Sequence, residues 1–371
     1  MVLVKESYVV DGAESLVTPS LVYYEDLIRQ NTEKVISLSG GTGRLWPHVK
    51  TFKMGSVIRI LMEYGIKRFK AATIAEAEMC AIEKAEDVLM AYPLVGVNIH
   101  RFISLALTYP ETTFWAIGDD ISLLSVLSAE AEKAGLVLNT LLDVNIGMNR
   151  TGGAIEDIKG KYREFSSLKG IRLRGLHCFS GNFKITDIAE RKEKIDSTAP
   201  RIMAVKDELT KEGFDEPSIV FGSTPSLPCY LEYDGTFLSP GTAFITDMSY
   251  FTKFPDLPFL PAACLISRVI SKPRNREFTL DCGYKHIAAE MQGDKGLLLG
   301  YEDAEAVFQC EEHWAFRMPE GKRAPELGEI VYILPTHICP TTAMYPYVYA
   351  SKGGSITGKW PVTARDLSVT V

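Results

Sequence analysis

The feature that most constrains the fold is an alternation between short apolar segments rich in strand-forming residues and longer segments with helical spacing. It runs eight times between residues 44 and 240, and eight such repeats predict a parallel (β/α)8 TIM-type barrel. A doubly wound open sheet is the alternative, and the barrel is favoured because a short eighth strand would close it. The strand-like segments are 44–49, 67–71, 87–92, 113–117, 137–143, 171–177, 217–221 and 236–240.

The intervening segments predict helices with apolar residues on one face. The clearest are 54–64, 74–85, 121–134 and 189–213, the last expected to form one long, charged surface helix. Thr73 and Glu76 are three residues apart and predict a capping box at the start of the 74–85 helix.

Residues outside this alternation predict a second, smaller domain. The stretch 254–261 is rich in proline, and the residues after it form strand-like runs at 264–269, 277–282, 306–309 and 330–334 without long helical patterns. Before the barrel, Tyr8-Val9-Val10 predicts a strand and 26–38 predicts a helix. We therefore expect a barrel domain over 19–250, and a β-rich domain over 251–371 joined by an N-terminal strand within 1–18.

Composition excludes several classes of partner. The 371 residues carry a formal net charge of −7 without any basic run, which argues against nucleic acid and anionic membranes as partners. No apolar run approaches the roughly 20 residues of a spanning helix, and the start has no apolar signal region, so we expect a cytoplasmic protein. Seven widely spaced cysteines predict reduced thiols rather than a disulfide framework.

Lys50 is the first candidate catalytic residue. It stands in Trp46-Pro47-His48-Val49-Lys50-Thr51-Phe52-Lys53, at the junction between the first predicted strand and its helix. His48 and Lys50 are two residues apart and share a face. Burial would lower the pKa of the ammonium and leave a free amine, as Schiff-base formation with an aldehyde cofactor requires. The alternative is an ordinary solvated lysine.

Small and hydroxylated residues follow the last two predicted strands, at Gly222-Ser223-Thr224-Pro225 and Pro240-Gly241-Thr242. TIM barrels commonly hold phosphate groups there, so the two loops together predict a phosphate site. Arg150 follows the fifth strand and His177 ends the sixth, where each faces the same end of a barrel. A surface salt bridge for Arg150 and a core position for His177 are the alternatives.

His337 and Cys339 form a candidate metal site. On a strand their side chains would project to one face, and imidazole with thiolate suits Zn²⁺. A structural zinc normally has four protein ligands, and no CxxC or HxxxH pattern completes this pair. Two protein ligands leave room for substrate, as in a catalytic site.

Several motifs carry a resemblance to fold-type III pyridoxal-phosphate enzymes, and among them to the D-threonine aldolase and D-serine dehydratase family. These motifs are PHVKT at 47–51, FKAATIAEAE at 69–78, GMNRTG at 147–152, GSTP at 222–225, CEEH at 310–313 and PTHICPT at 335–341. The resemblance covers nearly the whole chain. It implies that Lys50 forms the Schiff base, that Arg150 and His177 lie by the cofactor ring, and that Gly222, Ser223, Thr224, Gly241 and Thr242 hold its phosphate.

The resemblance further implies a divalent metal on His337 and Cys339, with Zn²⁺ favoured and Mn²⁺ or Mg²⁺ possible. In the resembling family, aldolases tend to carry aspartate where Cys339 stands, and metal-dependent D-serine dehydratases carry cysteine. Aldolases often place a basic histidine within the segment that here reads Asn182-Phe183-Lys184. The base would then be His177, His313 or a metal-bound hydroxide.

The predicted function is that of a lyase on D-3-hydroxy-α-amino acids that uses pyridoxal phosphate and a divalent metal. D-threonine aldolase is placed first and zinc-dependent D-serine dehydratase second. A non-catalytic pyridoxal-phosphate-binding protein and a racemase are further alternatives. The resemblance implies a homodimer.

Overall fold

The computed structural model describes residues 3–370, which divide into two compact units. The barrel unit consists of Val35–Lys50, Val57–Gly241 and the residues from Asp366 onward. The β unit consists of the residues up to Lys34, then Thr51–Ser56 and Thr242–Arg365. The predicted domain limits, 19–250 and 251–371, stay a prediction. Within the described range no helix combines the length and the apolar character needed to cross a membrane.

The barrel unit contains seven parallel strands in sequence order, which confirms the predicted barrel class. Each lies within two residues of a predicted strand at both ends. They are β2 (Arg68–Ala71), β3 (Asp87–Met90), β4 (Thr113–Gly118), β5 (Leu138–Asp143), β6 (Ile171–Cys178), β7 (Ser218–Phe221) and β8 (Thr236–Leu238).

The segment that closes the barrel between β8 and β2 is not a regular strand, so the prediction of a strand over 44–49 is wrong. Two isolated bridges replace it, Leu45 with Leu238 of β8 and His48 with Lys70 of β2. Pro47 has no N–H to donate and only accepts, from the Lys70 backbone at 2.7 Å, which interrupts a regular ladder. Residues Val49–Thr51 then form a short 3₁₀ helix. The segment 44–48 still closes the barrel on both sides.

An aromatic cluster inside the barrel fixes this closing segment. Trp46 is buried, and its Nε1 donates to the Phe69 carbonyl oxygen at 2.7 Å. Its ring meets Trp115 and Phe237 edge to face, each with ring centroids 5.3 Å apart. Such pairs add to the free energy gained from burial alone. The residues before Lys50 are therefore anchored in the core.

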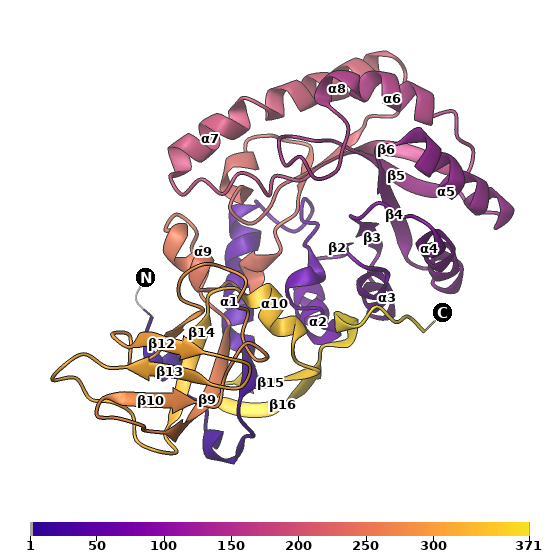
Figure 1. The fold of residues 1–371 in the computed structure, drawn as a ribbon. Coiled ribbons are helices and arrows are strands. Elements are labelled where there is room, and N and C mark those ends of the chain that lie inside the picture. Colours follow the sequence, from indigo (N-terminus) through magenta and orange to yellow (C-terminus); the bar gives the residue numbers. More distant parts are fainter. Residues whose placement is uncertain (1–2, 371) are drawn as a thin grey trace. The chain divides into compact units, whose positions relative to one another are not determined.

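Helices lie outside the parallel strands (Figure 1). Thr73 caps α3 as predicted, because its Oγ1 accepts from the Glu76 N–H at 3.1 Å, while Glu76 reaches back to the Ala72 N–H at 2.6 Å. The single helix predicted over 189–213 is wrong. Pro200, in the first turn of the second helix, favours a new start there, since it lacks a backbone donor. The helices are α2 (Gly55–Glu63), α3 (Ile74–Ile82), α4 (Val97–Thr108), α5 (Ile121–Lys133), α6 (Ile158–Phe165), α7 (Ile188–Asp196) and α8 (Ala199–Lys211).

The β unit is built on a nine-stranded, mainly antiparallel sheet. The four strands predicted between 264 and 334 are present, and the other five strands of the sheet were not predicted. The strands are β1 (Ser20–Tyr24), β9 (Ala263–Ser271), β10 (Glu277–Leu280), β11 (Gly296–Leu298), β12 (Glu305–Gln309), β13 (Trp314–Arg317), β14 (Ile330–Pro335), β15 (Tyr347–Lys352) and β16 (Ser355–Pro361). Its helices are α1 (Glu25–Leu38), which extends into the barrel unit, α9 (Met248–Lys253) and α10 (Ile338–Ala343).

The N-terminal strand predicted within 1–18 is wrong for residues 3–18, which contain no strand. Tyr8 and Val10 are buried in the core of the β unit without joining a sheet ladder. The strand of this region is β1, which pairs antiparallel with β9 and parallel with β15.

Asp247 connects two helices of the β unit. It is buried, and its Oδ1 accepts from the Tyr250 N–H at 3.0 Å and so caps α9. Its Oδ2 accepts from the Ile338 N–H at 3.1 Å, at the start of α10. Burial raises the pKa of Asp247 to about 6 although these backbone bonds lower it. One carboxyl group therefore satisfies donors at two helix starts.

We expect Asp247→Ala to lower the free energy of unfolding by about 2 to 4 kcal/mol, because two buried N–H groups lose their acceptor. Urea unfolding followed by circular dichroism measures this. Asp120→Ala is the matched control, since exposed Asp120 caps only α5, through the Leu123 N–H, and should cost about 1 kcal/mol. Equal losses in the two variants would contradict the double role of Asp247.

Candidate active site

A cavity of about 550 Å³ opens at the carboxyl ends of the barrel strands. It brings together three residues predicted from the sequence, Lys50, Arg150 and His177, which come from distant parts of the chain. In a TIM barrel this end of the strands is where active sites are found. His48, Lys70 and Phe179 also line it.

Lys50 lies in the 3₁₀ helix that follows the closing segment, and it is partly buried. Its backbone N–H donates to the His48 Nδ1 at 3.3 Å. Its Nζ lies 5.4 Å from the centroid of the Phe179 ring, just beyond β6. The backbone of Lys50 is thus anchored at the cavity wall while its amine faces the cavity.

His177 and Asp143 form a buried pair at one wall of the cavity. They are register partners on β6 and β5, and Nδ1 of His177 lies 2.7 Å from Oδ1 of Asp143. Burial raises the pKa of Asp143, but the hydrogen bond and charge of His177 outweigh it and hold the pKa below its usual value. Burial is also the largest influence on His177 and lowers its pKa.

This pairing determines the tautomer of His177. An ionised Asp143 accepts the proton of Nδ1, so the neutral ring carries a lone pair on Nε2. Nε2 is buried and has no hydrogen-bond partner among residues 3–370. A buried polar atom of this kind is normally satisfied by a ligand or water. His177 is therefore not a satisfied core histidine.

Lys70 is a cavity residue that the sequence interpretation missed as a functional residue. It lies on β2 with only 1% of its surface exposed. Burial, followed by the charges of Lys50 and Arg150, lowers its pKa to about 7, against an opposing effect of Asp143. The available signal was a single lysine at a core position of a barrel strand, between Phe69 and Ala71.

Three cations surround the Phe179 ring. Arg150 Cζ lies 4.7 Å and Lys70 Nζ 5.5 Å from its centroid, besides the Nζ of Lys50. Cations near a ring face are attracted by its quadrupole, but they repel one another. The cavity therefore favours anionic ligands.

The two predicted phosphate loops meet at the ends of β7 and β8. Gly241 N–H donates to Thr224 Oγ1 at 3.2 Å, and Ser223 N–H donates to Ser226 Oγ at 2.9 Å. Gly222 has φ +104°, a conformation that residues with a Cβ rarely adopt. The Oγ of Ser239, between the loops in sequence, is buried without a partner in the described chain. The loops thus present small residues and hydroxyl groups, with one polar atom unsatisfied.

The predicted metal pair is placed differently from the expectation. His337 and Cys339 are not on a strand, because β14 ends at Pro335 and His337 is the residue before α10. The two side chains still meet, at the first turn of that helix. Burial lowers the pKa of His337, but a hydrogen bond and charge from Cys339, with Glu290, raise it to about 9.

Further polar groups surround this pair. His337 Nδ1 contacts a carboxylate oxygen of Glu290, and Cys339 Sγ donates to Thr51 Oγ1 at 3.4 Å. Thr242 Oγ1 lies 3.9 Å from the same Sγ. Thr51 is the residue after Lys50 in the chain. No group of three or more His, Cys, Asp or Glu side chains suited to a metal occurs in residues 3–370.

His313, the remaining predicted base, lies on the hairpin between β12 and β13. It is exposed, and its Nδ1 lies 3.8 Å from the Cys310 Sγ. Across the described residues no hydrogen bond or ion pair joins it to His337 or Cys339. A catalytic role for His313 stays a prediction.

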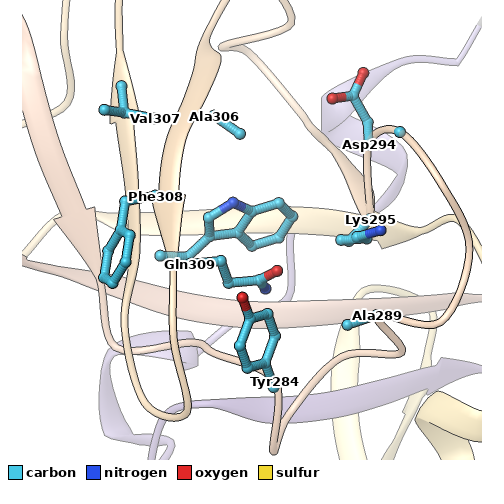
Figure 2. Close-up of a pocket in the computed structure, with 10 residues that line it drawn as sticks. Tyr284, Ala289, Asp294, Lys295, Ala306, Val307, Phe308 and Gln309 are labelled. Carbon is cyan, nitrogen blue, oxygen red and sulfur yellow. The ribbon is translucent and has the colours of Figure 1, made fainter.

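The β unit has a cavity of its own, of about 540 Å³, around which Figure 2 shows Tyr284, Lys295 and Gln309. None of the predicted site residues lines it. Beside it, β12 is exposed along most of its length and forms the edge of the sheet, with Phe308 61% exposed.

Two family models match the chain. Residues 25–248 match the alanine racemase N-terminal domain, and residues 262–351 match a putative serine dehydratase domain. The first match covers more than half of the chain. The chain belongs to the alanine racemase N-terminal domain family. The chain combines this domain with the putative serine dehydratase domain. Its resemblance to the D-threonine aldolase and D-serine dehydratase family is confirmed.

Relatives of nearly the same length support this assignment. A D-threonine aldolase of Arthrobacter sp. is 23% identical over 87% of this chain and 86% of its own. A 3-hydroxy-D-aspartate aldolase of Paracoccus denitrificans (strain Pd 1222) is 22% identical over 94% and 92%. The crystal structure of D-threonine aldolase from Filomicrobium marinum aligns with a TM-score of 0.87 at 23% identity, covering 95% of this chain and 96% of the other. This structural likeness shows the shared fold.

The residues present fit pyridoxal phosphate, the cofactor that the family resemblance implies. The unsatisfied Nε2 of His177 and the Arg150 guanidinium face the cavity that would receive the ring. Lys50 offers the amine for the aldehyde. Beside the predicted phosphate loops, the Oγ of Ser239 is a buried hydroxyl group without a partner in the described residues, which suits a phosphate oxygen. For the metal, a histidine nitrogen and a cysteine sulfur suit Zn²⁺.

The lowered pKa of Lys70 predicts a pH-dependent stability in the cofactor-free protein. Its ammonium has a pKa near 10.4 in the unfolded chain and about 7 in the folded one. Between these values the unfolded state binds more protons, so this lysine destabilises fully below pH 7 and hardly above pH 10.4. Lys70→Met should therefore raise the melting temperature at pH 6 by about 3 °C or more, with a gain that fades toward pH 10.

Thermal unfolding from pH 6 to pH 10 measures the effect. Lys206→Met is the matched control, because Lys206 is also buried but pairs with Glu216 at 2.7 Å. That variant should gain no stability at pH 6. A Lys70→Met protein less stable than wild type at pH 6 would show that the ammonium is not an electrostatic liability.

Proposed function

We propose that this protein is a lyase that uses pyridoxal phosphate and a divalent metal to cleave D-amino acids bearing a 3-hydroxyl group, with D-threonine as substrate and glycine and acetaldehyde as products. The observation that carries the proposal is the cavity in which the Lys50 amine, the Arg150 guanidinium and the unsatisfied Nε2 of His177 converge. The family membership supports the lyase class.

Each of these residues has a defined task. Lys50 would hold the cofactor through its amine. Asp143 fixes the ring orientation and tautomer of His177, so that Nε2 presents its lone pair to the ligand. The loops after β7 and β8 bind the phosphate. When bound, pyridoxal phosphate supplies an electron sink for the bond broken at Cα, and the metal polarises the hydroxyl group.

His337 and Cys339 would hold the metal, with Zn²⁺ favoured over Mn²⁺ and Mg²⁺ because nitrogen and sulfur ligands suit the softer ion. The contact of Glu290 with Nδ1 leaves Nε2 of His337 for the metal and fixes the ring, as carboxylates do for metal-binding histidines. Two protein ligands leave positions for the substrate hydroxyl and for water.

Opposing observations bear on which bond is broken, the Cα–Cβ bond in an aldolase or the bond to the 3-hydroxyl group in a dehydratase. The two curated relatives of nearly full length are both named aldolases, which supports cleavage between Cα and Cβ. The cysteine at 339 and the match of residues 262–351 to a putative serine dehydratase domain support the second candidate, dehydration of D-serine to pyruvate and ammonia. We place the aldolase first.

We also propose that the protein forms a homodimer. The edge strand β12 exposes Val307 and Phe308, and Tyr284 beside it is 46% exposed. An open edge with apolar side chains is a surface that proteins usually cover. A non-catalytic binding protein is disfavoured because it would have no use for the His337–Cys339 pair, and a racemase would have no use for a hydroxyl-binding metal.

With D-threonine as substrate we expect glycine and acetaldehyde as the main products. His313→Ala should lower kcat/KM by about a hundredfold while cofactor absorbance is unchanged, if His313 is the base that accepts the hydroxyl proton. His177→Ala should lower activity by at least that factor and also change the cofactor absorbance, because His177 faces the ring. Chromatographic product analysis and visible spectra measure both.

Keto acid and ammonia as dominant products, 2-oxobutanoate from D-threonine and pyruvate from D-serine, would reverse the assignment in favour of the dehydratase. In that case solvent deuterium would enter at Cα, because the reaction begins with loss of the Cα proton. Full activity of His313→Ala would leave His177 or a metal-bound hydroxide as the candidate base.

Removing the metal should abolish turnover and leave the cofactor in place. We expect exhaustive chelation and His337→Ala each to lower kcat by about a hundredfold or more, since the hydroxyl loses its Lewis acid. The visible absorbance of the cofactor should persist, because its predicted ligands other than Thr242 belong to the barrel unit. Metal content and activity are measured on the same sample.

His100→Ala is the control for the loss of a histidine, because the exposed His100 only pairs with Glu130 on the barrel surface. It should keep wild-type activity. Full activity with negligible metal content would refute the catalytic metal and leave His337 and Cys339 with structural roles.

A further inference from the structure

Lys70 has a position that only the folded barrel creates. Its backbone is held on both sides, by β3 in register at Leu89 and by the closing segment, where its N–H donates to the Pro47 oxygen at 2.7 Å. The bridge between His48 and Lys70 places it beside the segment that leads into Lys50. Two lysines from separate elements therefore line one cavity.

Among residues 3–370 the ammonium of Lys70 has no hydrogen-bond or ion-pair partner. Its side chain is almost completely buried and lines the cavity. Its Nζ lies 5.5 Å from the centroid of the Phe179 ring. A buried charge is normally paired, so this ammonium is placed for a ligand.

The charges around Lys70 leave an excess of positive charge. Lys50 lies on the 3₁₀ helix, Arg150 follows β5, and both lower its pKa, so both act on it electrostatically. The neighbouring carboxylate is Asp143 on β5, which is already bonded to His177 on β6. His48, on the closing segment, adds no negative charge. Asp143 keeps its negative charge beside the neutral imidazole and offsets one of the three cations, so the positive charge that remains favours an anionic ligand.

A structural role does not account for this arrangement. Lys206, the other lysine that is buried in the barrel unit, meets Glu216 at 2.7 Å and so has the counterion expected of a structural lysine. Lys70 has none and faces a cavity large enough for a small ligand. The comparison between the two lysines isolates what is unusual about Lys70.

We propose that Lys70 is an anion-binding residue of the active site, whose ammonium contacts an anionic oxygen of the bound cofactor and substrate. This inference rests on the proposed function. The shared chemistry is an oxygen anion within reach of an ammonium, and it has two sources, the phenolate oxygen of pyridoxal phosphate and a carboxylate of the amino acid. In either case the ammonium forms a charge-assisted hydrogen bond.

The charge inventory supports this role. When Lys50 is bound to the cofactor, its amine is committed, and Arg150 and Lys70 remain as cationic side chains of the cavity. The ligands bring a phenolate and a carboxylate in addition to the phosphate, which has its own loops. Arg150 and Lys70 can then each bind one of these anions, whereas Arg150 alone would have to serve both.

The test uses the loaded enzyme and three substitutions, Lys70→Met, Lys70→Arg and the control Lys206→Met. Lys70→Gln serves as a second neutral variant if the Lys70→Met protein does not bind the cofactor. Borohydride reduction with peptide mapping comes first, on the wild type. Label on Lys50 establishes the cofactor attachment on which the proposed function depends, so absence of any label is a failure of that function and precedes the question about Lys70.

The first readout is the pH titration of cofactor absorbance. The group that titrates is the nitrogen through which Lys50 is joined to the cofactor. If the anion is the phenolate, Lys70→Met should raise the apparent pKa of this nitrogen by about one unit or more, because a nearby cation that disfavours its protonated form is lost. Lys70→Arg should restore the wild-type value, and Lys206→Met should keep it.

The second readout compares D-alanine with D-alaninol, which present the same amine but differ in the carboxylate. The wild type should bind D-alanine more tightly than D-alaninol. If the anion is the substrate carboxylate, this ratio of affinities should fall about tenfold or more in Lys70→Met and return in Lys70→Arg. The absorbance titration would then stay unchanged.

Two outcomes would overturn the proposal. One is that the wild type is labelled on Lys50, but Lys70→Met and Lys70→Gln change neither the pH titration of cofactor absorbance nor the preference for D-alanine over D-alaninol. The other is borohydride label on Lys70 itself, which would make it the covalent amine.

Discussion

The active-site cavity depends on how the barrel is closed. The segment 44–48 bridges β8 and β2 through single residue pairs, and Trp46 anchors it in the core. Because Pro47 interrupts the ladder, the chain leaves the barrel wall as a 3₁₀ helix instead of continuing as a strand. That exit directs Lys50 to the cavity and sets it beside Lys70. The position of the Lys50 amine is thus a consequence of barrel closure.

Electrostatics gives this cavity its chemical character. Burial lowers the pKa of His177 against the opposing effect of Asp143, and the bond of Nδ1 to Asp143 leaves Nε2 open. Lys50, Lys70 and Arg150 share the Phe179 ring. Such a surplus of cations opposes folding of the empty protein and favours binding of an anionic ligand. Cofactor and substrate would therefore stabilise the fold as well as react within it.

The β unit contributes a separate chemical group. Asp247 satisfies donors at the starts of α9 and α10, and His337 and Cys339 stand at the second of these starts. The pair meets because a helix begins there. A nitrogen and a sulfur donor, with a carboxylate on the far side of the imidazole, form an arrangement suited to a metal that must also accept substrate.

The sequence by itself determined the barrel class, seven of its strands and the convergence of Lys50, Arg150 and His177. These follow from local periodicity and from the rule that the carboxyl ends of parallel strands share one face of a barrel. It also indicated the family through motifs spread along the chain. Errors arose where the local pattern is ambiguous. Tyr8 and Val10 are buried without joining a strand ladder, and within 189–213 Pro200 restarts the helix.

Only the tertiary structure decided the partners of the polar groups. Asp143 and His177 are 34 residues apart in sequence, and the pairing that leaves Nε2 open exists only because β5 and β6 are neighbours in register. The unpaired state of Lys70 likewise depends on what surrounds β2, which no local pattern specifies. His337 and Cys339 were found from their spacing, but the helix start that joins them was not. Burial and pairing are properties of the packed chain, and they turn a lysine in a strand into an active-site cation.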